Sequence, residues 1–201
     1  MKILAATGNK HKIKEFQSIL TPLGIDFIAP NEVGGIPDTE ETGNSFEANA
    51  SLKALDAAKA TNMYSFADDS GLEIEALNNA PGIFSSRYAN TDEQRISRVL
   101  NELKHIQTTS GICNRNARFV CVIAFSTPDK ILKLFRGEVY GTIADAPSGK
   151  EGFGYDPIFI PNGYKKSFAQ LSPNEKDKIS HRANALVKAK SFFQQELHKL
   201  K

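Results

Sequence analysis

The chain has 201 residues, of which 40% are hydrophobic and 24% are charged. These fractions are typical of a soluble globular protein and exclude the disordered and fibrous classes. The 25 basic and 23 acidic residues almost cancel, without a long run of either sign, so we expect neither a nucleic-acid nor a membrane partner. The sequence contains no repeat and no Pro/Gly-rich linker. We therefore expect residues 1–201 to form a single domain, as one body or as two lobes that share a core.

The cysteine content and the length of the apolar segments indicate the cellular compartment in which the protein is found. Cys113 and Cys121 are too few for a disulfide framework, and Cys121 lies in an apolar run where it fits core packing. The apolar segment that follows Met1 is too short for a signal peptide, and no segment has the length of a membrane span. We expect a cytoplasmic protein.

The first strand and helix enclose a short polar segment. Residues Lys2 to Ala6 are expected to form a strand, and Ile13, Phe16 and Leu20 recur at helical spacing. Between them, Thr7 to Lys12 would aim the first amides of the helix and the positive charge of a lysine at a ligand, which suits a phosphate. The segment alone is more often an ordinary turn with surface lysines.

A second strand, Ile25 to Ala29, leads into a long acidic loop that ends at Gly43 and carries Glu40 and Glu41. Such carboxylates are usually exposed, unless the fold returns them to a shared site.

The next helix is expected to start at a cap formed by Asn44 and Glu47. Asn49 and Lys53 lie four residues apart and share one stripe of this helix, most simply a solvated face.

Two adjacent carboxylates, Asp68 and Asp69, follow the short apolar run from Tyr64 to Ala67. We expect the run to be a buried strand that Asp-Asp-Ser-Gly stops abruptly, and Leu72 to Ala76 to be a separate, half-exposed strand. Ionised carboxylates at such a place are costly to bury unless a cation or hydrogen-bond donors meet them. The alternative is a solvated turn.

The middle of the chain contains local signals for one helix and two strands. Thr91 and Gln94 form a capping box ahead of a clear helical stripe. Ala117 to Ser126 and Ile131 to Ile143 are expected to be strands, and Gly137 and Gly141 in the second suggest a bend or bulge.

A glycine-rich loop runs from Gly149 to Asp156 and carries Phe153 and Tyr155. Its backbone can approach a ligand closely while an aromatic face stacks on a nucleobase. A turn with both aromatic rings in the core is an equally good interpretation.

The last helical signal is Ser172-Pro173-Asn174-Glu175, a hydroxyl cap followed by proline and glutamate. His181 and Arg182 follow it, and a guanidinium could donate to a nucleobase carbonyl or a phosphate. Such a pair on a helix surface is more often solvated.

Taken together, the order and spacing of these segments resemble the inosine triphosphate pyrophosphatase family, the diphosphatases that remove noncanonical purine nucleoside triphosphates. The matching segments are Thr7-Gly8-Asn9-x-x-Lys12, Glu40-Glu41-Thr42-Gly43, Asn49-Ala50 with Lys53, Ala67-Asp68-Asp69-Ser70-Gly71-Leu72, Pro81-Gly82 through Ser86-Arg87-Tyr88, Gly152-Phe153-Gly154-Tyr155-Asp156-Pro157, and Lys176 with Ser180-His181-Arg182. Two positions depart from the pattern: Ala48 stands where bacterial members usually have glutamate, and Gln170 where they often do.

The resemblance implies an elongated α/β fold with a long curved mixed β-sheet flanked by helices, two lobes with an active-site cleft between them, and a homodimer. It implies hydrolysis of ITP, dITP or XTP to the monophosphate and pyrophosphate with Mg2+. Asp69 would be the catalytic base, and Glu41 and Asp69 the metal ligands, with Asp68 supporting the metal through its water shell. The residues expected to bind substrate are Thr7, Gly8, Asn9, Lys10, His11, Lys12, Lys53, Ser70, Phe153, Gly154, Tyr155, Asp156, Lys176, His181 and Arg182.

Two other functions are open on the sequence. One is a related house-cleaning pyrophosphatase for pyrimidine or modified nucleotides, which would lack the Ser180-His181-Arg182 element that is present here. The other is a non-catalytic nucleotide-binding protein that keeps the pocket without the turnover. Such a protein would be indicated by loss of the Asp or Glu residues, and these are present.

Overall fold

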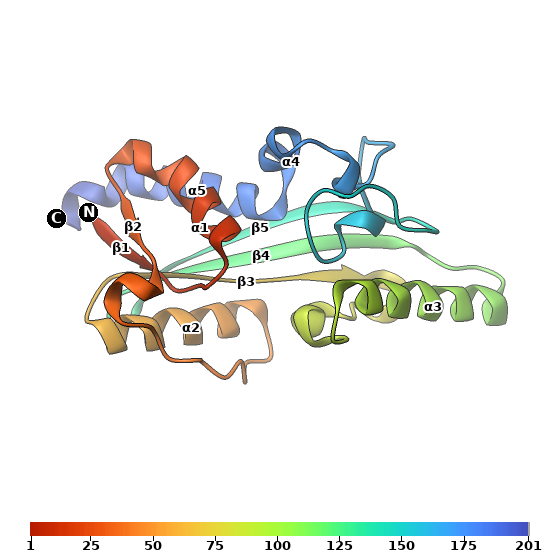
Figure 1. Ribbon diagram of the computed structural model, residues 1–201, viewed down its shortest axis with the longest axis horizontal. Helices are drawn as coiled ribbons and strands as arrows, with labels where there is room; N and C mark the ends of the chain where they lie inside the picture. The colour runs from red at the N-terminus through yellow and green to blue at the C-terminus, as the bar shows by residue number, and fades with distance from the viewer. Residues whose placement is uncertain (201) are drawn as a thin grey trace. The chain divides into compact units, whose positions relative to one another are not determined.

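The computed structural model describes residues 1–200, in which six strands form one mixed sheet (Figure 1). The strands are β1 (Lys2–Ala5), β2 (Asp26–Ile28), β3 (Ser65–Ile74), β4 (Asn116–Ser126), β5 (Ile131–Ile143) and β6 (Phe159–Pro161), and their order across the sheet is β2-β1-β3-β4-β5-β6. Strand β1 pairs in parallel with β2 and β3, whereas β5 and β6 are antiparallel. Helices flank this sheet, which confirms the mixed α/β class.

The described residues form five α-helices, of which the first three lie between strands and the last two follow β6 in the chain. They are α1 (Lys10–Leu20), α2 (Phe46–Thr61), α3 (Asp92–Ser110), α4 (Pro173–Ile179) and α5 (His181–Glu196). Short 3-10 helices lie at Thr21–Leu23, Pro30–Val33, Glu75–Leu77, Gly82–Arg87, Asp156–Ile158, Phe168–Gln170 and Leu197–Lys199. The two caps read from the sequence at α3 and α4 are confirmed, because Thr91 accepts the N–H of Gln94 and Ser172 accepts that of Glu175.

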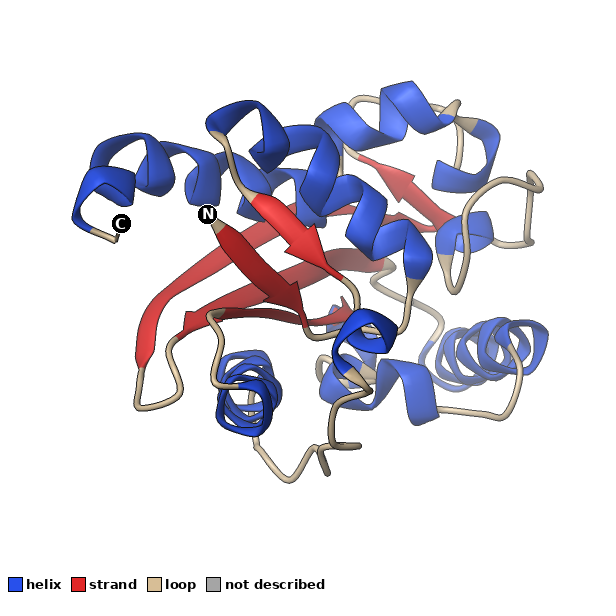
Figure 2. Cartoon of the chain, turned by 60° about the vertical axis from the view of Figure 1, so that its left-hand side comes forward, coloured by secondary structure: helices blue, strands red, loops and turns tan. Residues whose placement is uncertain are grey.

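The described chain divides into two compact units. The first contains Met1–Asp69, Cys121–Gly137 and the residues from Arg182 onward. Its core is rich in aromatic rings, with Phe66 packed edge-on against Phe16 at a centroid distance of 5.3 Å. Helices α1 and α5 cover one face of its strands and α2 covers the other, as Figures 1 and 2 show. Residues on opposite faces of β3 therefore meet different helices.

The second unit contains Ser70–Val120 and Glu138–His181. Its core joins α3 to the strands and to the segment after β6, with Phe119 4.7 Å from Phe159 between ring centroids. Gly141 on β5 allows a close approach of β6, because a Cβ there would clash with the carbonyl oxygen of Ile160.

Three local expectations were wrong. The Asp-Asp-Ser-Gly segment does not stop a strand or form a solvated turn, since β3 runs without interruption from Ser65 to Ile74. The cap of α2 is Ser45, whose hydroxyl accepts the N–H of Ala48, and not Asn44. Asn49 does not lie on a solvated helix face, because it is fully buried. The first and third outcomes depend on partners from other elements, which the local pattern does not specify.

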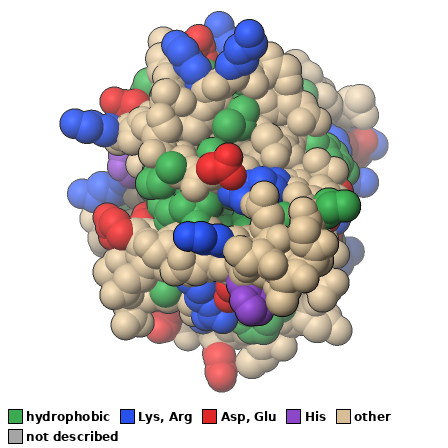
Figure 3. Space-filling model, turned by 90° about the vertical axis from the view of Figure 1, so that its right-hand side faces the viewer, with side chains coloured by type: hydrophobic (Ala, Val, Ile, Leu, Met, Phe, Trp, Pro, Cys, Tyr) green, Lys and Arg blue, Asp and Glu red, His purple; other side chains and the backbone are tan. Residues whose placement is uncertain are grey.

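The surface in Figure 3 carries interspersed basic and acidic side chains, with hydrophobic groups scattered between them. Within residues 1–200, no helix combines the length and the apolar character that crossing a membrane requires.

Candidate functional site

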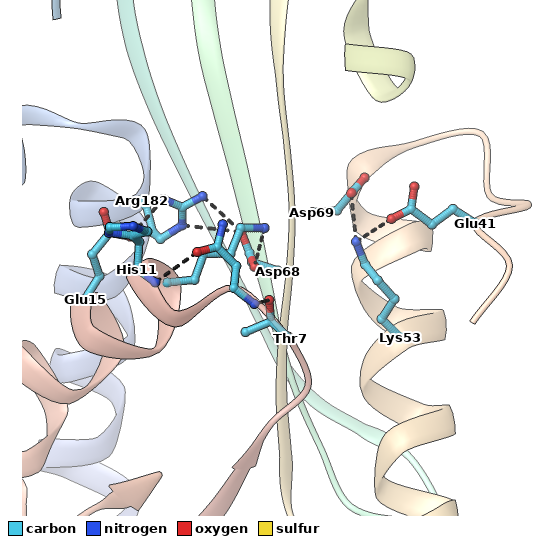
Figure 4. A network of polar contacts seen from close by, with 10 residues as sticks. Thr7, His11, Glu15, Glu41, Lys53, Asp68, Asp69 and Arg182 are labelled. Atoms are coloured by element: carbon cyan, nitrogen blue, oxygen red, sulfur yellow. Dashed lines mark hydrogen bonds and ion pairs between the residues drawn. The ribbon is translucent and has the colours of Figure 1, made fainter. Parts of the chain in front are cut away.

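Asp68 and Asp69 are neighbours on β3 and point to opposite faces of that strand (Figure 4). Successive side chains of an extended strand alternate between faces, so the two carboxylates reach different helices. Both residues are buried, at 3% and 7% exposure. Their burial requires separate sets of cationic or hydrogen-bonding partners.

Asp69 faces α2 and the loop that precedes it. Lys53 on α2 donates from Nζ to Asp69 Oδ1 at 2.9 Å and to Glu41 Oε1 at 2.7 Å. One ammonium thus joins two carboxylates that lie 28 positions apart, at 41 and 69, in the sequence. Glu41 occupies this place, whereas its neighbour Glu40 is exposed to solvent.

The charges of this cluster shift the pKa values of its members. Burial raises the pKa of Asp69, with a smaller contribution in the same direction from Glu41, and Lys53 opposes the rise only in part. Burial lowers the pKa of Lys53, but Asp69 and the hydrogen bond to Glu41 outweigh it, so this pKa is raised overall. Asp69 is therefore a better proton acceptor than an ordinary aspartate, beside a lysine that stays charged.

Asn49 lies one helical turn before Lys53 and contacts the same carboxylate. Its Oδ1 accepts the backbone N–H of Gly43 at 2.8 Å, and its Nδ2 donates to Asp69 Oδ2 at 3.4 Å.

Asp68 faces α1 and α5 on the other side of β3. Lys12 Nζ lies 2.9 Å from Asp68 Oδ1, and Arg182 donates to Asp68 Oδ2 at 3.3 Å. Arg182 also donates to Glu15 at 2.8 Å. Burial would raise the pKa of Asp68, but Lys12 and Arg182 outweigh burial and hold it below the usual range. Asp68 is therefore a permanently charged partner for two cations.

The turn between β1 and α1 has the strand-turn-helix geometry expected of it. Asn9 is the N-cap of α1, and its Oδ1 accepts the N–H of His11 at 2.9 Å. Thr7 Oγ1 accepts the N–H of Asn9 at 3.2 Å. Lys10 is the first residue of the helix. These bonds fix the turn that contains Gly8. The turn leads directly into α1, the helix that carries Lys12 to Asp68.

In the second unit, the glycine-rich loop is fixed from inside. Asp156 is buried, accepts the N–H of Phe153 at 2.9 Å and forms an ion pair with Lys176. Phe153 is 44% exposed, and Lys176 Nζ lies 4.9 Å from the centroid of its ring. The N–H of Gly154 donates to Asp92 at the start of α3 at 2.8 Å. The loop therefore presents one aromatic face to solvent beside a lysine.

The remaining expected site residues of the second unit are less exposed. Tyr155 belongs to the core, and its hydroxyl donates to the carbonyl oxygen of Ser85 at 2.9 Å. His181 is buried and stacks on Phe119 at a centroid distance of 4.8 Å. Ser70 follows Asp69 on β3 and is half-buried. Each of the two interpretations of the aromatic loop therefore holds for one ring. Phe153 is exposed, as stacking on a base requires, and Tyr155 lies in the core.

The pair Glu41 and Asp69 is the donor set that fits a magnesium ion. Residues 1–200 contain no group of three or more His, Cys, Asp or Glu side chains placed to hold a metal. Mg2+ commonly binds to one or two carboxylates and completes its octahedron with water and substrate phosphates. Both carboxylates contact the ammonium of Lys53, so their oxygens already converge on one cation.

Comparison with known proteins shows the family of the chain. The model of the Ham1 family matches residues 3–192. The chain belongs to the Ham1 family. A dITP/XTP pyrophosphatase of Bacillus subtilis is 46% identical over 194 residues, covering 95% of this chain and 96% of the relative. One of Synechocystis is 44% identical over 188 residues, with 92% of each covered. A HAM1 protein from Coxiella burnetii superposes with a TM-score of 0.89 at 43% identity, covering 97% of this chain and 99% of that chain.

Within this Ham1 protein, the sequence did not indicate Glu15 or Asp92, which shape the candidate site, and it favoured a solvated position for Asn49. Glu15 resembles any exposed acid of α1, yet it pairs with Arg182, which lies 167 positions away. Asp92 resembles a helix-start acid but holds Gly154. Asn49 carried a usable signal, because it shares a stripe with Lys53 and precedes the buried Ala50. A polar residue at a buried helical position requires a polar partner.

Proposed function

We propose that this Ham1 protein hydrolyses nucleoside triphosphates with noncanonical purine bases, namely ITP, dITP and XTP, to the monophosphate and pyrophosphate. The observation that carries the proposal is the buried Asp69, which shares Lys53 with Glu41 and whose pKa is raised by burial. Relatives in Bacillus subtilis, Synechocystis and Staphylococcus aureus are named dITP/XTP pyrophosphatases, which supports the same reaction.

Asp69 acts as the general base in this proposal. It accepts a proton from a water molecule, whose oxygen attacks the α-phosphorus as the bond to the bridging oxygen of the β-phosphate breaks. Pyrophosphate leaves with the electron pair of that bond, and the α-phosphate remains on the nucleoside. Lys53, Lys12 and the amides of the turn from Thr7 to Lys12 offset the phosphate charges.

Glu41 and Asp69 would hold Mg2+. The ion, when bound, supplies positive charge to the phosphate oxygens and lowers the pKa of its bound water. Lys53 would orient the triphosphate through its positive charge, and to do so it would give up part of its contact with the two carboxylates. We assign Asp68 to the balance of charge with Lys12 and Arg182, since it points away from Asp69 (Figure 4).

The exposed ring of Phe153 would stack on the purine, with Lys176 beside it. Gly154, Tyr155 and Asp156 hold the loop in place. Ser70, His181 and Arg182 complete the proposed substrate set, with Arg182 as the donor to the oxygen at C6 of the base.

The test is a product assay with ITP, XTP, ATP and Mg2+. The proposal expects pyrophosphate and IMP from ITP in equal amounts. With 18O-labelled water, the label should appear in IMP. Release of orthophosphate with IDP, or label in pyrophosphate, would contradict attack at the α-phosphorus.

Two properties accompany the proposed activity. We propose that the protein is cytoplasmic, as its low cysteine content indicates, and that it forms a homodimer, as the resemblance to its family implies. Light scattering coupled to size exclusion gives the mass in solution, and a mass near the 22.1 kDa of one chain would contradict the dimer.

A further inference from the structure

Asn49 is a fully buried side chain on α2 that none of the roles above uses. It bonds to both parts of the chain that carry the proposed metal ligands. Its amide oxygen holds the backbone at Gly43, two residues after Glu41, and its amide nitrogen reaches Asp69 on β3.

The two bonds fix the orientation of the amide group. Because Gly43 offers a backbone N–H, the oxygen of Asn49 must face it, and the NH2 group must face the carboxylate. A reversed amide would set donor against donor at Gly43 and acceptor against a carboxylate at Asp69. Each contact thereby selects the other.

Gly43 approaches this amide more closely than any residue with a side chain could. A Cβ at position 43 would lie 2.6 Å from Asn49 Oδ1 and 2.7 Å from the Cβ of Ala48. The backbone of Gly43 is not in the left-handed region for which glycine is otherwise chosen, so the reason for glycine here is the close approach of the loop to α2.

Asp69 is held on both oxygens from the same helix. Oδ1 accepts from Lys53 at 2.9 Å and Oδ2 from Asn49 at 3.4 Å, and these residues lie four apart on α2. The loop is held at two points as well, by Lys53 at Glu41 and by Asn49 at Gly43. If Lys53 yields to Mg2+, the Asn49 contacts are the part of this arrangement that does not depend on that lysine.

We propose that Asn49 is a positioning residue, a clamp that holds the Glu41 loop against Asp69 so that the two carboxylates stay at the spacing of one cation. This rests on the proposed role of Glu41 and Asp69 as ligands of Mg2+. Removing a partner that orients a metal ligand commonly weakens metal affinity by about 10- to 100-fold.

The test compares Asn49→Leu and Gly43→Ala with the wild-type protein. Leucine matches the size of Asn49 but removes both bonds, and Gly43→Ala pushes the loop off the amide from the other side. In both variants, the amide hydrogen of residue 43 should exchange with solvent faster than it does in the wild-type protein. Calorimetric titration of Mg2+ into protein saturated with an α,β-imido analogue of ITP should show affinity reduced by about tenfold or more.

Two further variants separate the clamp from general damage. Asn49→Asp retains the acceptor for Gly43, so protection of that amide should return. Ser51→Ala, on the same helix, removes only a bond to the carbonyl of Glu47 and should leave Mg2+ affinity unchanged. Raised Mg2+ should restore part of the turnover of Asn49→Leu, with KM for ITP nearly unaltered.

Unchanged exchange at Gly43 or unchanged Mg2+ affinity in both Asn49→Leu and Gly43→Ala would overturn the clamp. Glu41→Gln and Asp69→Asn show which idea failed. If Mg2+ affinity falls in those two variants but not in Asn49→Leu, only the clamp is wrong. If it falls in none of them, the assignment of the metal ligands is wrong as well.

Discussion

Asp68 and Asp69 are adjacent in the chain, but Asp68 pairs with Lys12 and Arg182 on one face of β3, and Asp69 pairs with Lys53 on the other. The alternation of a β-strand separates the two carboxylates although they are neighbours. Because each face supplies its own partners, substitutions of these aspartates should have different effects.

Asp69→Asn should abolish most of the turnover while leaving the fold intact. Burial already disfavours the charge of Asp69, so a neutral amide of the same shape should cost little stability. The variant loses the proposed base and a metal ligand, and we expect kcat to fall by about a hundredfold or more. Steady-state kinetics with ITP, together with urea unfolding, measure the two effects. Near-normal activity would move the proton acceptor elsewhere, first to Glu41.

Asp68→Asn should have the opposite effect, a large loss of stability, because Asp68 is the charged partner of buried Arg182. It leaves Arg182 buried beside an uncharged group, with Glu15 as its remaining charged partner. Breaking a buried ion pair from one side costs about 3–5 kcal/mol, and with Glu15 still present we expect a loss near the lower value in the free energy of unfolding. Urea titration at neutral pH measures it. A loss below about 1 kcal/mol would show that Lys12 and Glu15 rearrange to compensate.

The helices and most strands could be predicted because their signals are local. The Thr91 cap and the hydrophobic stripe of α3 lie within a few residues of each other, and the structure repeats them. The uninterrupted course of β3 could not be predicted, because the cations that permit two carboxylates inside a strand come from distant parts of the chain. Arg182 lies 114 positions from Asp68, and Lys12 and Lys53 arrive on separate helices.

The candidate site was predictable as a set of residues and not as a set of contacts. The sequence identified Glu41, Lys53 and Asp69, which the fold brings together. It gave no means of telling which aspartate faces which helix, since register and strand direction decide that. It also left open whether Phe153 or Tyr155 is the exposed ring.

Phe153→Leu should weaken nucleotide binding with little change in kcat. Leucine keeps an apolar side chain at this exposed place but removes the ring, and base-aromatic stacking contributes about 1–3 kcal/mol. We expect KM for ITP to rise by about tenfold, and similarly for XTP, because stacking does not depend on base edges. Phe84→Leu is the matched control, since Phe84 is also an exposed ring with a cation, Arg87, near its face. Equal KM values in the two variants would exclude the stacking role of Phe153.

Tyr88 should ionise late, and its ionisation should cost stability. Its hydroxyl donates to Glu102 at 2.6 Å, and burial together with that carboxylate raises its pKa to about 12. A raised pKa in the folded state means that the contribution to stability is complete below pH ~10 and is lost as pH rises towards ~12. Ultraviolet titration of the wild-type protein should contain a late phase that Tyr88→Phe diminishes, while Tyr155, whose pKa burial also raises, continues to ionise late. Glu102→Gln should move that phase to lower pH, and an unmoved phase would contradict the assignment.

Arg182→Ala should reveal whether this residue reads the base as well as balancing Asp68. Hypoxanthine and xanthine have an acceptor oxygen at C6, where adenine has an amino donor, so a guanidinium donor favours the first two. An unpaired buried donor costs about 1–3 kcal/mol, or roughly a tenfold to hundredfold penalty for ATP. We expect the ratio of kcat/KM for ITP to that for ATP to fall by this factor in the variant.

Loss of Arg182 also strips Asp68 of a partner, so stability alone cannot decide its role. Asp68→Asn is the control, because it disturbs the same buried pair while keeping the guanidinium. If Arg182 reads the base, both variants lose stability but only Arg182→Ala changes the ITP to ATP ratio. Measurements belong at a temperature where urea unfolding shows both variants folded. An equal ratio in wild type and Arg182→Ala would leave the pairing with Asp68 and Glu15 as the whole function of Arg182, and would require another donor for the C6 oxygen.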